Sequence, residues 1–337
     1  MRKTVLQNLA AYCIAGLIIA YLLRGISLKQ VTDSIGHANL WIFVPATLAS
    51  FLCWFLGETL LFSYLFSYFH RRTSFLELIP ANAAQYFLQV INMMVAGGAL
   101  VLFLHQRKKV PWLAGGCTLL FQSFVDWFVL ATMAIVAALL VPSSKIFLGL
   151  PFAAGSLVLW FAIAAFWMIG NPKLRFGKWL YARPSMVSFR EARPEHYFKL
   201  ILIRAPIFAF QGFVLYAQLR SFHVQVPLHQ VLAFTPAVLV MGGLPITPVG
   251  LGPLQAVLMT GFSAFAAKAQ LLTMALSISM MNIIIRIPLG LGSAGAFAHE
   301  VSATKQKAAL GGPAVVEELA SEAAEEIIGQ KSAGARG

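Results

Sequence analysis

Four ionisable residues stand inside long apolar stretches of the sequence: Glu58, Asp126, Arg204 and Arg286. A charge at membrane depth is costly unless it faces a cavity or an opposite charge. We therefore predict a buried ion pair between Asp126 and Arg286, since either charge alone would be uncompensated in a low dielectric. Gln122 lies one helical turn before Asp126 and would share its face. These residues are candidates for a polar substrate path, although such pairs also serve only to lock helices together.

The other two ionisable residues are interpreted differently. Arg204 is near the basic end of its apolar stretch, so we expect its side chain to extend to the membrane interface. Glu58 has no evident partner and is interpreted as a lone protonated acid. Both are secondary candidates for the path.

Patterns typical of enzymes and metal sites are absent from the sequence. No nucleophile stands beside a base, and no phosphate-binding or dinucleotide-binding glycine loop occurs. The three cysteines have no C-x-x-C spacing, and the seven histidines are scattered. We therefore predict a protein that is not an enzyme and that has no metal and no cofactor.

The composition indicates a membrane protein. Of the 337 residues, 59% are hydrophobic and 11% are charged, against about 25% charged in soluble domains. The formal charge is +13, but the basic residues gather beside apolar runs, where they orient spans and do not form a nucleic-acid site. We predict a multi-pass protein of the plasma (inner) membrane whose partner is a membrane lipid, with an anionic head group among the candidates and no nucleic acid.

Long apolar runs predict six full spans, with both termini in the cytoplasm because basic residues flank the corresponding ends. The expected spans are residues 5–23, 40–66, 112–141, 147–170, 197–219 and 270–298. Residues 1–298 then form the transmembrane domain, and residues 299–337 form a flexible cytoplasmic tail rich in alanine and glutamate.

Two further apolar segments, residues 76–104 and 233–262, are interrupted by glycine and proline. Proline removes a backbone donor and glycine lets the chain turn, so neither segment is expected to be one continuous helix. Broken backbone cannot face lipid, and transporters place binding sites at such breaks. The alternative is a kinked helix whose glycines allow close packing. The interrupting residues that we assign to the path are Gly97, Gly98, Pro245, Pro248, Gly250 and Gly252.

The order of these elements is repeated. A span, an interrupted segment and a span occupy residues 40–141, and the same order follows in residues 197–298. The charges place the start of the first set outside and the start of the second inside, which is typical of alternating-access carriers. The predicted fold is an all-α polytopic membrane protein of about six full spans plus two re-entrant hairpins, arranged as an inverted repeat.

Several motifs resemble the flippase-like transmembrane domain of lysylphosphatidylglycerol synthases. In chain order they are NMMVAGGALVLFL, FVDWFVL, LPITPVGLGPLQA (residues 244–256) and NIIIRIPLGLGSAG. The resemblance implies a bundle that moves lipids between leaflets, without the separate soluble synthase domain. The sequence departs from the family at Gln255, where an acid usually follows G-x-G, and at Gln122 and Ser123, where the family has a charged pair.

We therefore expect a lipid transporter whose interrupted segments meet in the bundle. The head group would contact Asp126, Arg286, Gln122 and Gln255 together with exposed backbone of the broken segments. Two alternatives remain open. One is a membrane-embedded enzyme acting on a lipid head group, for which Asp126→Asn should abolish turnover. The other is a non-catalytic accessory or scaffold protein of a lipid or envelope pathway, which would contact its partner through the tail.

Overall fold

The computed structural model describes residues 36–91, 93–141, 150–169, 175–243 and 251–311. All regular structure in these ranges is helical, which confirms the all-α class. The predicted first span, residues 5–23, lies outside the described residues. The four ionisable residues Glu58, Asp126, Arg204 and Arg286 all belong to a compact unit that ends at Leu291. A second unit begins at Gly292.

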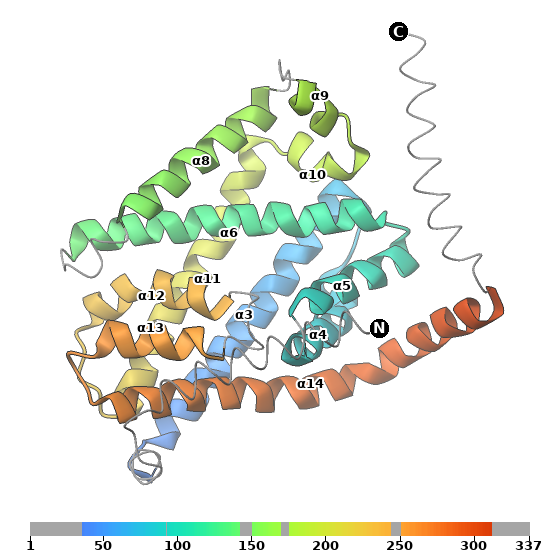
Figure 1. The fold of residues 1–337 in the computed structure, drawn as a ribbon. Helices are drawn as coiled ribbons and strands as arrows, with labels where there is room; N and C mark the ends of the chain where they lie inside the picture. The colour runs from blue at the N-terminus through green and yellow to red at the C-terminus, as the bar shows by residue number, and fades with distance from the viewer. Residues whose placement is uncertain (1–35, 92, 142–149, 170–174, 244–250, 312–337) are drawn as a thin grey trace. The chain divides into compact units, whose positions relative to one another are not determined.

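Five helices are long and apolar enough to cross a membrane (Figure 1). They are α3 (Leu40–Phe69), α6 (Trp112–Leu140), α8 (Leu150–Ile169), α11 (Pro194–Ser221) and the Lys268–Gly290 part of α14 (Lys268–Gly311). Each has at least the roughly 20 residues that the hydrocarbon core of a bilayer requires. Four of them agree with the predicted spans to within three residues at each end, and the last begins two residues before the predicted start at residue 270. The multi-pass prediction is thereby supported, while α14 continues past the predicted boundary at residue 298.

Both interrupted segments are helical hairpins. The first consists of α4 (Phe75–Ile91) and α5 (Met93–Lys108), and the second of α12 (Leu228–Gly243) and α13 (Pro253–Phe262). Within each hairpin the two helices pack against one another (Figure 1). The position predicted for the first break is wrong, because Gly97 and Gly98 lie inside α5, which begins at Met93, after α4 has ended at Ile91. Glycine weakens a helix without ending it when the intrahelical hydrogen bonds continue.

The two ends of the first hairpin are joined by an electrostatic contact. At the start of α4 the Ser74 N–H donates to Glu77 Oε2 at 3.0 Å, and the Lys108 ammonium at the end of α5 lies 3.0 Å from the same oxygen. The Ser74 N–H and then Lys108 hold the pKa of Glu77 below its ordinary value. The beginning and the end of this hairpin therefore lie together, as a re-entrant element requires.

The second hairpin depends on a glycine at its restart. Gly252 has a φ of 99°, in the left-handed region that favours glycine, and Pro253 follows at the first position of α13. Pro245, Pro248 and Gly250 lie outside the described residues.

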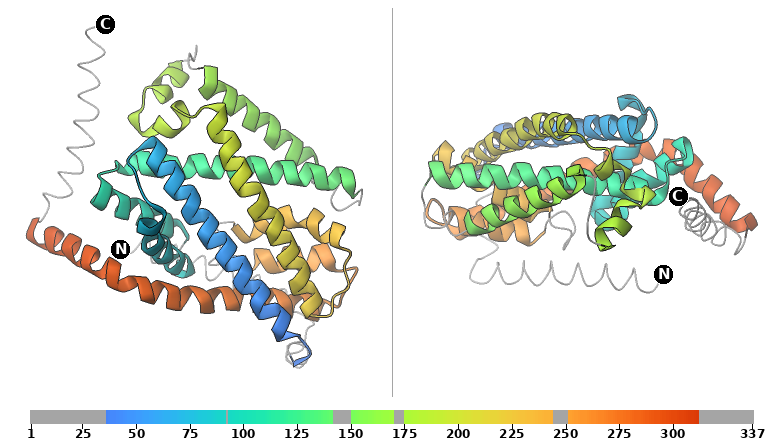
Figure 2. Two further views of the ribbon diagram at one scale, coloured as in Figure 1. Left: turned by 180° about the vertical axis from the view of Figure 1, so that it is seen from behind. Right: turned by 90° about the horizontal axis from the view of Figure 1, so that it is seen from above.

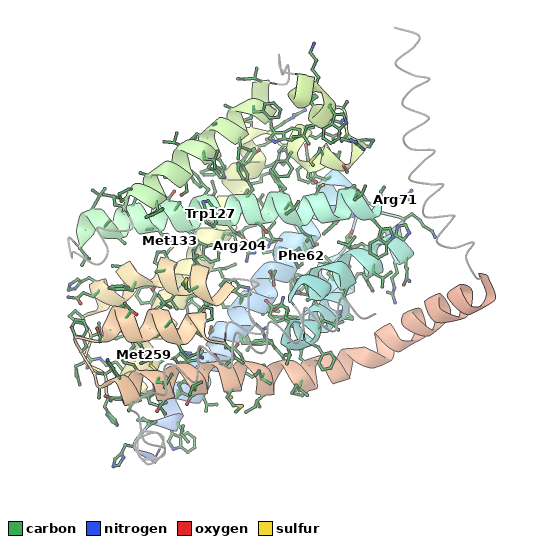
Figure 3. The ribbon with its side chains drawn as sticks, in the orientation of Figure 1. Phe62, Arg71, Trp127, Met133, Arg204 and Met259 are labelled. Carbon is green, nitrogen blue, oxygen red and sulfur yellow. The ribbon has the colours of Figure 1, made fainter. Side chains whose placement is uncertain are left out.

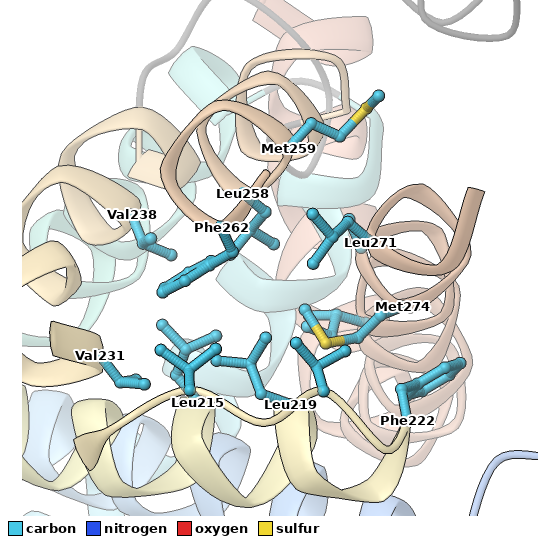
Figure 4. Packing of buried hydrophobic residues seen from close by; sticks show 14 of the residues in the cluster. Leu215, Leu219, Phe222, Val231, Val238, Leu258, Met259, Phe262, Leu271 and Met274 are labelled. Atoms are coloured by element: carbon cyan, nitrogen blue, oxygen red, sulfur yellow. The ribbon is translucent and has the colours of Figure 1, made fainter. Parts of the chain in front are cut away.

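Helices α3 and α11 run side by side and pack against one another (Figure 2). They approach closely at Gly57, where an added Cβ would lie 2.3 Å from a methyl carbon of Ile207. Small residues allow this kind of close approach in membranes, where packing replaces the hydrophobic driving force. A core of buried apolar side chains joins α11, α12, α13 and α14 (Figure 4), with Leu258, Phe262 and Leu271 fully enclosed.

Three short helices follow α8 in the basic loop: α9 (Arg175–Tyr181), η1 (Pro184–Met186) and α10 (Val187–Arg190). Both η1 and α10 pack against α6. The contact includes a buried hydrogen bond of 2.6 Å between the hydroxyls of Thr118 and Ser188. The loop is thus folded against the bundle at this point.

Candidate functional site

A cavity of about 550 Å³ lies among α3, α4, α6, α11, α12, α13 and α14. Its volume falls in the range of about 300–1,000 Å³ that is usual for ligand sites. The wall combines apolar residues with an unusual number of polar side chains for helices of this apolarity. The polar residues are Ser50, Glu58, Gln89, Gln122, Ser123, Asp126, Arg204, Gln211, Gln218, Thr235, Asn282 and Arg286.

Arg204 of α11 is the electrostatic centre of the wall. Its Nε lies 2.6 Å from Asp126 Oδ1, and its Nη2 donates a hydrogen bond to Asp126 Oδ2 at 2.9 Å. The same Nη2 is 3.8 Å from Oε1 of Glu58. The Arg204 side chain is only 1% exposed, against 20% for Asp126 and 13% for Glu58. One guanidinium therefore holds two carboxylates, one from α3 and one from α6. Arg204 is labelled in Figure 3.

This arrangement corrects two predictions. Asp126 pairs with Arg204 and not with Arg286, because α6 and α11 pack against one another. Arg204 does not extend to the interface, since its whole side chain is enclosed between its carboxylate partners. An ionised pair with one hydrogen bond and a second short contact offsets much of the cost of burying each charge.

Glu58 is also not a lone acid. Besides the Arg204 guanidinium, its carboxylate accepts a hydrogen bond of 2.6 Å from the Tyr86 hydroxyl of α4. The ring of Tyr86 packs edge-on against Phe51 and Phe55 of α3, which holds the hydroxyl in position. The charged cluster thus connects α3, α4, α6 and α11.

Arg286 of α14 lies on the same wall in different surroundings. Its guanidinium carbon is 5.1 Å from the centre of the Tyr86 ring, and its buried Nε has no hydrogen-bond partner among the described residues. Gln122 lines the cavity one turn before Asp126, on the same face of α6.

Gln255 faces the interior of the second hairpin and does not line the cavity. Its Oε1 accepts the Gly252 N–H at 2.6 Å, and its Nε2 donates to Ser279 Oγ at 3.0 Å. The side chain thereby satisfies the first turn of α13 and ties it to α14. Gly97, Gly98 and Gly252 are likewise not among the cavity residues of the described chain.

We predict a structural effect when Gln255 is replaced by leucine. The buried Gly252 N–H would lose its acceptor and the Ser279 hydroxyl its donor, which should lower the free energy of unfolding by about 1–3 kcal/mol. Gln255→Glu should be milder, because it keeps the acceptor for Gly252. Unfolding in a mixed detergent titration measures the difference, and equal stability of all three proteins would contradict the assignment.

Gln211 and Gln218 were missed by sequence reasoning, and their spacing is a signal that could have found them. They follow the candidate Arg204 at intervals of seven residues and so share its face of α11. Gln211 exchanges hydrogen bonds with Ser50 of α3, and Gln218 donates to Thr47 of the same helix. A polar residue at every second turn of an apolar helix marks the face that lies against the cavity.

The spanning helices define a multi-pass membrane protein, and charged and amide side chains contribute to the wall of its cavity. The family model of the lysylphosphatidylglycerol synthase TM region matches residues 8–290. The chain therefore belongs to this family, as its motifs indicated. Membership associates it with lipid modification or transport. A comparison with curated proteins finds no match.

Proposed function

We propose that this protein is a flippase-type transporter that carries a lipid head group through the cavity between the two leaflets. The observation that carries the proposal is the enclosure of charged and amide side chains in a cavity of about 550 Å³ among helices of high apolarity. Polar groups at membrane depth are costly, and a pathway for a polar group is the usual reason for their presence.

The outer surface suits the lipid chains. Large apolar residues on the outside of the spanning helices are well exposed, among them Leu120, Leu139, Phe152 and Leu202. A lipid could leave its acyl or isoprenoid chains against this surface while its head group occupies the cavity. The free-energy barrier falls because the head group then exchanges water for polar side chains and never contacts hydrocarbon.

Alternating access is the mechanism that we propose for the movement. The order helix, hairpin, helix occurs twice, first as α3, α4–α5 and α6, and then as α11, α12–α13 and α14. We interpret the two sets as an inverted repeat in the plasma membrane, with both termini cytoplasmic. The sequence has no ATP-binding motif, so a gradient or consumption of the lipid would set the direction.

Filling the cavity should stop transport. Gly243 of α12 lines the cavity, and a Cβ added there meets no described atom within 4 Å. Gly243→Trp should reduce the transfer of labelled lipid in proteoliposomes to the rate of protein-free liposomes. The measurement is the accessibility of labelled lipids to a membrane-impermeant reductant over a panel of head groups.

The matched control is Gly155→Trp on α8. This glycine is exposed and also has open space around its Cβ, but it does not line the cavity, so transfer should equal that of the wild type. Wild-type protein that moves no lipid of the panel with or without an ion gradient would overturn the proposal.

Chromatography of the recovered lipid tests the enzyme alternative, since transport leaves the lipid unchanged. A protein lacking residues 299–337 tests the scaffold alternative and should transport normally.

A further inference from the structure

The two carboxylates of the cavity share one guanidinium unequally. The Nε of Arg204 lies 2.6 Å from Asp126 Oδ1, and its Nη2 donates to Asp126 Oδ2 at 2.9 Å. The same Nη2 is 3.8 Å from Glu58 Oε1, beyond the length of a hydrogen bond. One positive charge balances one negative charge, and the short contacts belong to Asp126. Glu58 is therefore the carboxylate that can take up a proton without loss of the ion pair between Arg204 and Asp126.

The hydrogen bonding of Glu58 favours one of its oxygens as the proton acceptor. Oε2 accepts the Tyr86 hydroxyl at 2.6 Å, and the ring of Tyr86 packs against Phe51 and Phe55. A proton on Oε1 would leave this bond in place, because the second oxygen of a protonated carboxyl is still an acceptor. The Glu58 side chain is 13% exposed and lines the cavity, so a proton that enters the cavity can reach it.

Charged and titratable groups face Glu58 from four helices. They are Tyr86 of α4, Asp126 of α6, Arg204 of α11 and Arg286 of α14. With both carboxylates ionised, two positive and two negative charges line the cavity, so its formal charge is zero. A proton on Glu58 leaves two positive charges and one negative charge. A charged head group in the cavity and the proton then change one another's affinity by the same factor.

Polar side chains lead away from this cluster along α11. Gln211 exchanges hydrogen bonds with Ser50 of α3, and Gln218, one further interval along α11, donates to Thr47. Ser50, Gln211 and Gln218 all line the cavity. Polar side chains inside an apolar bundle mark the route by which ions and protons pass. The cavity thus offers a path for protons towards Glu58 from the Ser221 end of α11.

We propose that Glu58 is a proton-binding site that couples lipid transport to a proton gradient. This inference rests on the proposed transport function and names the gradient that drives it. On one side of the membrane a proton from solution binds Oε1 and an O–H bond forms. On the other side the same bond breaks and the proton returns to solution. One proton crosses in each cycle, and no electron is transferred.

Arg204 provides the means of releasing the proton. Its Nη2 has to approach Oε1 of Glu58 by about 1 Å to reach hydrogen-bond distance. The guanidinium then stabilises the ionised carboxylate, and the proton leaves. Beside this contact α3 and α11 pack closely, where a Cβ added to Gly57 would lie 2.3 Å from a methyl carbon of Ile207. A small shift of one helix along the other therefore changes the distance between Arg204 and Glu58.

The test measures lipid transfer and proton transfer in the same proteoliposomes. The vesicles contain a pH-sensitive dye, and the panel of labelled lipids is read with the membrane-impermeant reductant. With wild-type protein a pH gradient should enrich a transported lipid in one leaflet, and the reversed gradient should reverse the enrichment. Glu58→Gln keeps the size of the side chain and an acceptor for Tyr86 but takes up no proton. Its enrichment and its lipid-dependent pH change should both fall to the level of protein-free liposomes.

The matched control is Glu191→Gln. This acid is exposed, lies beside Arg190 in the basic loop and does not line the cavity, so the variant should respond to the gradient as the wild type does.

A second measurement detects the proton on Glu58 without transport. Infrared difference spectra of the purified protein are taken between the two ends of the physiological pH range, where exposed carboxylates stay ionised. The wild type should show the carbonyl band of a protonated carboxyl. Glu58→Gln should lack this band, and Glu191→Gln should keep it.

Three results would overturn the inference. Wild-type protein that transfers lipid without enrichment under either gradient would show transport that is not coupled to protons. A response to the gradient that survives in Glu58→Gln would place the proton elsewhere, and so would a carbonyl band that is missing from the wild type or kept in Glu58→Gln. The transport proposal fails separately. If no lipid of the panel moves but the band is present in the wild type and lost in Glu58→Gln, transport is refuted and the proton site stands.

Discussion

Replacing Arg204 by methionine should lower the free energy of unfolding by about 3–5 kcal/mol, the usual cost of removing one partner of a buried ion pair. The loss would leave the carboxylates of Asp126 and Glu58 on the cavity wall without their shared cation. Methionine fills a similar space, so the loss of unfolding free energy would come mainly from the missing charge and less from altered packing. Unfolding of the purified protein in a mixed detergent titration is the measurement.

Two further variants make the Arg204 prediction specific. Arg220→Met on the same helix changes an exposed arginine and should alter stability by no more than about 0.5 kcal/mol. Adding Asp126→Leu to Arg204→Met should recover part of the loss, since an apolar pair avoids the uncompensated charge. A loss for Arg204→Met no larger than for Arg220→Met would show that the cluster does not hold the helices together.

Gly290→Ala should destabilise the packing of α14 against α4. A Cβ at this position would lie 2.2 Å from Cβ and 2.5 Å from Cγ of Phe87. The Phe87 Cβ cannot move without its backbone, so the two helices must separate locally. Overpacking of this kind costs about 1–3 kcal/mol. The same detergent titration measures it, and the separation should also widen the adjoining cavity wall at Arg286.

Gly98→Ala is the matched control for Gly290→Ala. Gly98 lies inside α5, and an added Cβ there meets nothing within 4 Å. Alanine favours a helix over glycine by about 1 kcal/mol, so this change should stabilise the protein or leave it unchanged. Equal stability changes of the two variants would contradict the close approach at Gly290.

Much of the fold could be predicted from local sequence. Apolar runs located the starts of all five described spans, and the ends of four of them, to within three residues. The length of such a run is set by the thickness of the bilayer and does not depend on the neighbouring helices. Glycine and proline located both interrupted segments, because these residues act on the adjacent backbone and their effect can also be predicted without knowledge of the neighbouring helices. The motifs around these segments indicated the family that the match over residues 8–290 confirms.

The partners of the polar residues were decided only by the tertiary structure. Asp126 and Arg204 are 78 positions apart, and the choice between Arg204 and Arg286 depends on which helix lies beside α6 and how each helix is rotated about its axis. The same applies to Glu58, whose partner Tyr86 belongs to a hairpin that the sequence identified without placing. Gln255 stands in a functional motif but turns into the hairpin, where it satisfies the backbone of Gly252. The burial of a side chain and the partner of a charged residue are both decided by the assembled bundle. Each helix by itself exposes every side chain to its surroundings.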